Sequence, residues 1–322
     1  MFKDKILRRE SGILLYGITP PKAHTPVEKI KEIAFKTKAR IQPLNIDGLV
    51  LYDIQDESSR VKDERPFPYF PTLAPDFFAS EYLHDLFVSK IIYRSVGKFT
   101  PNELGRWINT IEGQSHSVVF VGAPSKQQTV HLKLPEAYQV WKETNPSIIL
   151  GGVTIPERHH GERSEHLRIL GKVDHGCSFF ISQCVYNIEF VKNVVSDLYY
   201  HSQKNSTPFP TIIFTLTSCG SLKTLDFMNW LGINVPMWLR NDLHHSQDIL
   251  SKSVDLSIDI AEEITEYCIG KGIPFGFNIE SVSIRKEEIE ASEFLLERVD
   301  LILQRNKLRT AAETKLRQVL AE

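Results

Sequence analysis

Short apolar runs alternate with amphipathic stretches along almost the whole chain. The runs are rich in β-branched and aromatic residues, and we expect each to form a strand. The expected strands are 13–18, 48–52, 90–94, 117–121, 147–151, 177–182, 211–215 and 274–279. The stretches between them carry apolar residues at helical spacing. The expected helices are 26–39, 76–88, 101–112, 133–142, 163–174, 187–203, 220–230, 246–271 and 285–305.

This alternation predicts an α/β fold with a parallel sheet, and the number of strands predicts a (β/α)₈ (TIM) barrel. A doubly wound open sheet is the alternative, but no glycine-rich dinucleotide fingerprint follows any of the runs. We expect one barrel domain over residues 1–322, with a C-terminal helical extension from about 285 to 322. Residues 306–321 either complete the outer ring of helices or pack on a second subunit, so a homo-oligomer or a partner subunit is open.

The segment 165–187 joins this fold to a site. It predicts an amphipathic helix, a turn at Gly176 and a buried strand that starts with the apolar run 177–181. Ser182 and Gln183 then emerge where that strand ends. In an α/β barrel the chemistry lies at the carboxyl ends of the strands, so these two polar residues are candidates for ligand binding.

Composition and charge narrow the class of protein. The chain is 42% hydrophobic and 24% charged with a net charge of −2, so no basic excess indicates nucleic acid. No apolar run is long enough to span a membrane, and residues 1–10 lack the apolar core of a signal peptide. Four cysteines in 322 residues do not form a disulfide framework. We expect a cytoplasmic protein without a membrane or nucleic-acid partner.

Four segments resemble one known family in the same order. They are YGITPPK at 16–22, GVTIPERHH at 152–160, the segment 165–187 with its Lys-Val-Asp-x-Gly and Ser-Gln motifs, and the strand and helix at 208–236. Together these are similar to methylenetetrahydrofolate reductase. The resemblance implies one-carbon folate metabolism and methionine biosynthesis. It implies an oxidoreductase that reduces 5,10-methylenetetrahydrofolate to 5-methyltetrahydrofolate, with FAD on the barrel face and NAD(P)H as donor.

The resemblance also assigns residues. Gln183, with Ser182 before it, matches the position that hydrogen-bonds the folate pterin, and a carboxamide suits a heterocycle because it both donates and accepts. A glutamine that caps a strand end is the structural alternative.

Four cations match positions near the flavin in the family. Lys172 and Arg168 correspond to groups that face the flavin phosphates, and Arg94 and Arg60 also resemble family positions. A solvated helix face is the alternative for Lys172 and Arg168.

The chain departs from the family at its carboxylates. Gly17 stands where the family has its general-acid glutamate, and Ala123 stands where it has the aspartate beside the flavin. Lys90 replaces a flavin-contacting histidine. These losses leave three hypotheses open: a divergent reductase, a non-catalytic folate- or flavin-binding homologue or partner subunit, and a flavin-free folate-dependent methyl-transfer enzyme on the same barrel.

Two carboxylates are candidates to replace the missing acid. Glu280 ends the eighth strand, which is adjacent to the first in a closed barrel, and Asp53 follows the second strand. The alternative is that both are loop carboxylates that cap turns. We expect no metal site, because the cysteines and the histidine pairs lack Cys-x-x-Cys or His-Glu-x-x-His spacing.

The loop 60–75 contains four prolines and follows the second strand. Proline excludes a helix here and disfavours a central strand. The loop either forms a stiff lid over the active face or packs its aromatic residues as an ordinary connection.

Overall fold

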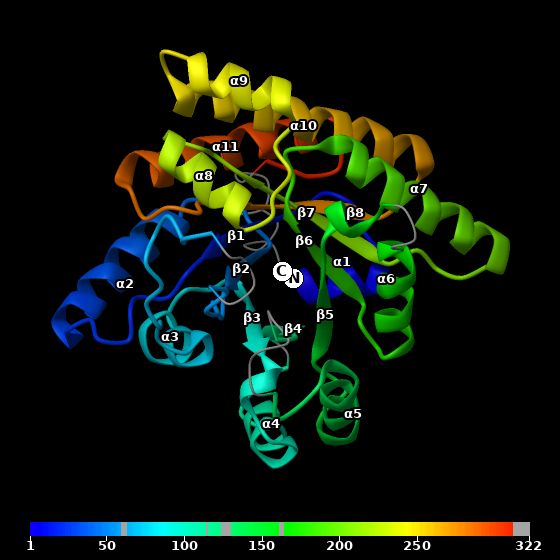
Figure 1. The fold of residues 1–322 in the computed structure, drawn as a ribbon. Helices are drawn as coiled ribbons and strands as arrows, with labels where there is room; N and C mark the ends of the chain where they lie inside the picture. The colour runs from blue at the N-terminus through cyan, green and yellow to red at the C-terminus, as the bar shows by residue number, and fades with distance from the viewer. Residues whose placement is uncertain (59–62, 114, 124–129, 161–163, 312–322) are drawn as a thin grey trace.

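The chain forms a closed barrel of eight parallel strands in sequence order, β1 to β8, in which β8 pairs with β1 (Figure 1). This confirms the predicted fold class. The computed structural model describes residues 1–58, 63–113, 115–123, 130–160 and 164–311. The strands are β1 Ile13–Ile18, β2 Gly48–Leu51, β3 Ser89–Ser95, β4 His116–Val121, β5 Ile149–Thr154, β6 Phe179–Cys184, β7 Thr211–Thr217 and β8 Phe275–Glu280.

Helices surround the barrel. They are α1 Phe2–Arg8, α2 Val27–Ile41, α3 Pro75–Tyr82, α4 Pro101–Ile108, α5 Leu134–Thr144, α6 Glu165–Asp174, α7 Ile188–Asn205, α8 Leu222–Trp230, α9 Met237–His245, α10 Ile249–Lys271 and α11 Lys286–Arg305. Two short 3₁₀ turns, η1 Val96–Lys98 and η2 Pro156–Arg158, follow β3 and β5. Among the helices within the described ranges, none is long and apolar enough to cross a membrane.

Every expected strand is present, and most expected helices agree within a few residues. The strands β5 and β6 each begin two residues later than expected, and they end three and two residues later. The helices α1 and α9 were not predicted. Residues 306–311 are not helical, and the remainder of the expected C-terminal extension, 312–322, lies outside the described residues.

The turn at Gly176 is confirmed. Its φ is +104°, and a Cβ there would lie 2.5 Å from a ring carbon of Trp141. Both the left-handed backbone and the close approach of the indole require glycine at this position.

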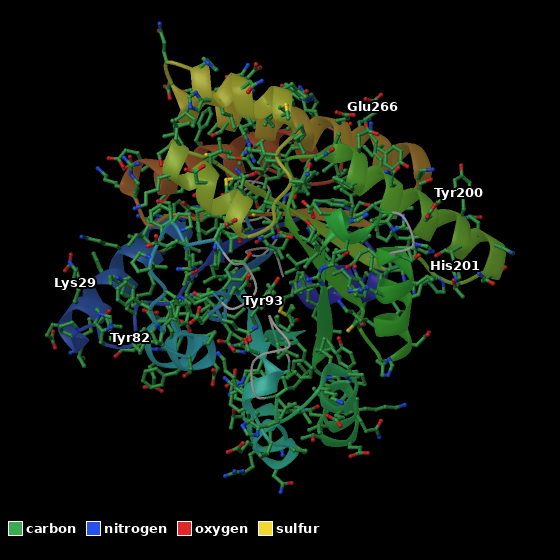
Figure 2. All side chains as sticks on the ribbon, viewed as in Figure 1. Lys29, Tyr82, Tyr93, Tyr200, His201 and Glu266 are labelled. Carbon is green, nitrogen blue, oxygen red and sulfur yellow. The ribbon has the colours of Figure 1, made fainter. Side chains whose placement is uncertain are left out.

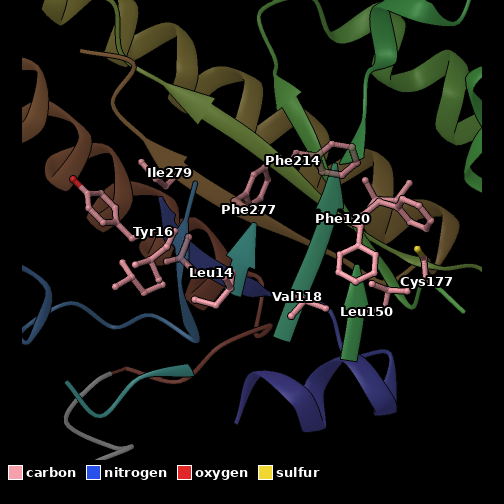
Figure 3. Packing of buried hydrophobic residues seen from close by; sticks show 14 of the residues in the cluster. Leu14, Tyr16, Val118, Phe120, Leu150, Cys177, Phe214, Phe277 and Ile279 are labelled. Atoms are coloured by element: carbon pink, nitrogen blue, oxygen red, sulfur yellow. The ribbon is translucent and has the colours of Figure 1, made fainter. Parts of the chain in front are cut away.

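Alternate residues of each strand point to the two sides of the sheet. The outward set packs under the helices and includes Leu14, Phe120, Leu150, Phe214 and Phe277 (Figure 3). These side chains bury the inner faces of the surrounding helices, which is why the expected helices are amphipathic.

The inward set fills the barrel with apolar side chains such as Leu15, Val50 and Ile213. At the N-terminal ends of the strands α1 closes the barrel, because Phe2 is fully buried and its ring packs edge-on against Phe179 at 5.2 Å between centroids. Apolar side chains therefore close this end of the barrel, which leaves the carboxyl ends of the strands as the place for a site.

Candidate functional site

Polar side chains gather inside the barrel at the carboxyl ends of the strands. Tyr52 directly follows β2, and Tyr93 lies on β3 within the ring of helices (Figure 2). Their rings make an edge contact with centroids 4.8 Å apart. Asn278 and Glu280 end β8 on the same inner face. These groups form the floor of the barrel mouth.

Glu280 lies beside the position where the resemblance expects a glutamate. It pairs in register with Gly17 on the neighbouring strand β1. A Cβ at Gly17 would lie 2.9 Å from a ring carbon of Tyr52 and 3.2 Å from the Cβ of Glu280. The glycine therefore leaves the space that the Tyr52 ring and the Glu280 side chain use, and a carboxyl group stands one strand away from the expected one.

The Glu280 carboxyl group is surrounded by weak acids. The Cys184 thiol donates to its Oε1 at 3.0 Å, and the Tyr52 hydroxyl also bonds it. Burial raises the pKa of Glu280 above its ordinary value, and the two hydrogen bonds oppose this shift. The arrangement favours a carboxyl group that keeps its proton to higher pH than usual, as a general acid requires.

Asn278 connects this carboxyl group to the sheet. Its Nδ2 donates to the Tyr52 hydroxyl at 2.8 Å and to Thr215 Oγ1 at 3.3 Å. Its Oδ1 is buried and has no hydrogen-bond partner in the part of the chain that the structure describes. The network fixes the mouth floor across β2, β7 and β8.

A cavity of about 610 Å³ opens beside this floor. Its size falls within the range of small-molecule sites. Its walls come from the loop after β2, the turn after β5, the end of β6 and the helix α8 with the residues that follow it. The lining residues are Asp63, Glu64, Pro66, Ile155, Glu157, Arg158, Gln183, Asp226, Asn229, Trp230, Leu231 and Gly232.

Gln183 reaches this cavity, whereas Ser182 does not line it. The Gln183 Nε2 donates to the backbone oxygen of Leu231 at 2.9 Å, which fixes the carboxamide on the cavity wall. The Ser182 hydroxyl is buried between strands, where it donates to the Gln183 oxygen and accepts the Thr215 amide at 2.9 Å. Ser182 thus joins β6 to β7 and positions the residue after it.

Glu157 is a site residue that the sequence did not single out, although it stands in the quoted PERHH motif. It lies on η2 and lines the cavity. Burial raises the pKa of its carboxyl group to about 7, against the opposing effect of backbone amides at Glu157 and Asn234. The only sequence signal that could have identified Glu157 is its position directly after Pro156, beyond the end of the fifth strand.

Two of the predicted flavin-side cations, one buried and one partly buried, are engaged by protein groups. The Arg94 guanidinium lies over the rings of Phe99 and Trp107, at 4.1 and 4.4 Å from their centroids, and pairs with Asp76 at 3.0 Å. Lys172 donates to the Val153 oxygen at 2.5 Å, and burial lowers the pKa of its ammonium.

Arg168 gives no phosphate site either, because it is exposed on α6, 4.0 Å from Glu165. Arg60 lies outside the described residues. A flavin pyrophosphate needs cations that converge on one space. The described cations do not converge, so they do not fit that group.

Asp53 and Lys90 also have defined places. Asp53 accepts the Ser95 amide at 2.8 Å and the Lys98 ammonium at 2.9 Å, so its carboxylate links the ends of β2 and β3. Lys90 lies at the start of β3, where it donates to the Leu86 oxygen at 2.6 Å. It therefore lies at the opposite end of the barrel from the mouth. A side chain at that end does not reach a cofactor at the mouth, so the alignment of Lys90 with a flavin-contacting residue is wrong.

The proline-rich loop rests on α8 over its described part, 63–74. Trp230 Nε1 donates to the Asp63 oxygen at 3.0 Å, and the Phe67 ring packs edge-on against Phe227 at 5.3 Å. Arg65 lies over the same phenylalanine, 4.9 Å from its centroid. The loop therefore packs its aromatic residues and forms one wall of the cavity at the same time.

Within the described ranges, one group of three side chains brings possible metal-ligand atoms within 4.8 Å of one another: His159, His166 and Asp197. The His159 ring already accepts the Glu165 amide on Nδ1 at 3.2 Å and faces Asp197 through Nε2 at 3.1 Å. A ring used in this way offers no lone pair to a metal. We interpret the group as a hydrogen-bonded cluster on the outside of the barrel, and the expectation of no metal site stays a prediction.

Comparison with known proteins shows a strong relationship to a solved structure. No protein-family model matches the chain, and no curated protein matches it. Among solved structures, a protein from Clostridium thermocellum that binds two copies of 5-methyl-5,6,7,8-tetrahydrofolic acid is 51% identical, with a TM-score of 0.84 over 94% of this chain and 100% of that chain.

More distant structures add no functional argument. A 2,3-dimethylmalate lyase is 12% identical with a TM-score of 0.41, covering 99% of this chain and 97% of that chain. The dihydropteroate synthase of Xanthomonas albilineans is 10% identical with a TM-score of 0.43, covering 90% and 92%.

The fold and the cavity together define a (β/α)₈-barrel protein with a cavity, lined largely by polar residues, at the carboxyl ends of its strands. At 51% identity over nearly its whole length, the chain belongs to the family of the Clostridium thermocellum protein that binds methyltetrahydrofolate. That relative binds a folate, which is the class of ligand that the sequence resemblance implies. The reductase activity that the resemblance also implies stays a prediction.

Proposed function

We propose that this protein binds 5-methyltetrahydrofolate in the cavity at the barrel mouth. The observation that carries the proposal is the 51% identity, over the whole length of the relative, to a protein that binds two copies of this folate. The cavity volume of about 610 Å³ and the Gln183 carboxamide on its wall support it.

The finer reductase proposal, with FAD and NAD(P)H, rests on the sequence resemblance alone. The protein partners of Arg94 and Lys172 argue against a flavin phosphate site at these residues. Folate binding without flavin is therefore the function that the geometry supports best.

A flavin-free methyl transfer is the second candidate, and Glu280 is the observation that favours it. When a nucleophile takes the methyl group of 5-methyltetrahydrofolate, the electron pair stays on N5, and a proton is needed there. Glu280 lies at the mouth with a raised pKa, whereas the Asp53 carboxylate is held by Lys98. We therefore propose Glu280 rather than Asp53 as the proton donor.

Calorimetric titration with 5-methyltetrahydrofolate tests the binding proposal. We expect the wild-type chain to bind up to two molecules. Gln183→Leu should weaken one site about 10-fold, since it removes a hydrogen-bonding amide from the wall. Gln139→Leu, on the exposed face of α5, is the matched control and should bind as the wild type does.

Two results would change the assignment. Failure of the wild-type protein to bind 5-methyltetrahydrofolate would remove the proposal. A protein that keeps stoichiometric yellow flavin after incubation with FAD and gel filtration would instead support a reductase. The Glu280→Gln variant would then be assayed for loss of NADH oxidation.

A further inference from the structure

The Glu157 carboxyl group is an incomplete hydrogen-bonding site inside the cavity. Its Oε2 is buried and has no hydrogen-bond partner among the residues the structure describes. A buried oxygen without a donor is costly, and native proteins rarely leave one. A ligand that brings N–H groups to this wall would satisfy it.

The charged groups that line the cavity favour one end of a folate over the other. Four carboxyl groups, those of Asp63, Glu64, Glu157 and Asp226, line it, against the single cation Arg158. Such a lining repels the anionic glutamyl tail of a folate. It favours the pterin end, which presents the 2-amino group and ring N–H donors.

Gln183 lines the same cavity as Glu157 and can hydrogen-bond the remaining donors and acceptors on the edge of the pterin ring. A pterin carries a 4-oxo acceptor and a ring nitrogen near its N–H donors, and a carboxamide provides both a donor and an acceptor. A carboxylate and a carboxamide together match the alternation of donors and acceptors on the ring.

We propose that the cavity is a pterin subsite in which the Glu157 carboxylate accepts the 2-amino group and the neighbouring ring N–H, while the glutamyl tail points out to solvent. This inference rests on the proposed folate binding and names the end of the ligand that is recognised and the residue that recognises it.

Ligand binding in this subsite is linked to pH. Burial raises the pKa of Glu157 to about 7, so the group is mostly protonated at pH 6. Arg158 beside it and the backbone amides favour the ionised form, whereas Glu165 on α6 opposes it. Asp226 on α8, and Asp63 and Glu64 in the loop after β2, face it across the cavity, and the Cys184 thiol lies nearby on β6.

The affinity for a pterin changes with pH in one direction. Two N–H donors bind the ionised form, so the affinity rises as the pH increases through 7, and binding below pH 7 releases a proton. At pH 6 we expect about one proton to be released per pterin bound.

The experiment uses the full chain and three probes: 5-methyltetrahydrofolate, 6-methyltetrahydropterin and p-aminobenzoylglutamate. We expect the tetrahydropterin to bind and to compete with the folate at one site, and p-aminobenzoylglutamate not to compete there. Glu157→Gln should weaken tetrahydropterin binding roughly 10- to 100-fold at pH 8 and much less at pH 6. Glu189→Gln, an exposed glutamate on α7, is the matched control.

The outcomes separate the two proposals. Wild-type pterin affinity and pH dependence in a folded Glu157→Gln protein that still binds the folate would overturn the pterin subsite and leave folate binding intact. Should that variant not fold, the proton count of the wild type decides, because no proton release at pH 6 would also overturn it. Absence of folate binding by the wild type would instead overturn the proposed function.

Discussion

Gly17 and Glu280 face each other across the seam between β1 and β8, and the space at that seam is shared with Tyr52. The glycine on β1 leaves the space that the carboxyl side chain on β8 and the Tyr52 ring use. At the scale of single residues, the place of the carboxyl group at the barrel mouth thus depends on which of the two paired positions, 17 or 280, carries the larger side chain.

Gly17→Ala should destabilise the protein by about 1–3 kcal/mol, because the new methyl group must displace the Tyr52 ring from a 2.9 Å contact. Urea unfolding measures the free energy. Gly270→Ala on α10 is the control, since a Cβ there meets nothing within 4 Å, and it should stabilise the protein by about 0.5–1 kcal/mol. Equal stability of Gly17→Ala and the wild type would show that Tyr52 is not tightly held.

At the scale of elements, α1 acts as the plug of the barrel. Phe2 and Ile6 belong to the same apolar cluster as the inward residues of the strands. The helix has only seven residues, too short to be stable by itself, so its packing on the barrel interior holds it in place.

Phe2→Ala should therefore lower the free energy of unfolding by about 3–5 kcal/mol, since it leaves a cavity against Phe179. Thermal and urea denaturation check this value. Leu7→Ala is the comparison, because Leu7 is 62% exposed on the same helix, and we expect a change within about 0.5 kcal/mol. A small effect of Phe2→Ala would mean that the strands fill the barrel without the plug.

At the scale of the whole molecule, Arg309 ties the chain after α11 to the beginning of the barrel. Its guanidinium is buried and pairs with Asp47 and, at 2.8 Å, with Asp300. It also donates to the backbone oxygens of Gly12 at 2.9 Å and Asn45 at 2.6 Å. One side chain thus joins segments that are almost three hundred residues apart.

Arg309→Ala should cost about 3–5 kcal/mol of stability, because it leaves the buried carboxylate of Asp300 without its cation and removes from Asp47 one of the two cations, Arg309 and Lys5, that pair with it. Arg305→Ala removes an exposed ion pair with Glu262 and should cost at most about 1 kcal/mol. Chemical denaturation of both variants gives the comparison. Similar losses in the two would mean that the buried network contributes no more than a surface pair.

Local patterns in the chain predicted the features that depend on neighbours in sequence. The strand periodicity, the turn at Gly176 and the position of Gln183 at a strand end follow from side-chain spacing and backbone sterics within a few residues. The barrel, and the end of it at which the cavity opens, followed from these local features.

Only the tertiary structure decided the features that depend on distant partners. The pattern of Arg94 and Lys172 fits a phosphate site equally well, but Asp76, Trp107 and the Val153 oxygen engage them in the fold. The cavity beside Glu157 exists because the loop after β2 and α8 meet over the end of β6. Contacts of this kind are set by packing between segments far apart in the chain, and a local pattern carries no information about them.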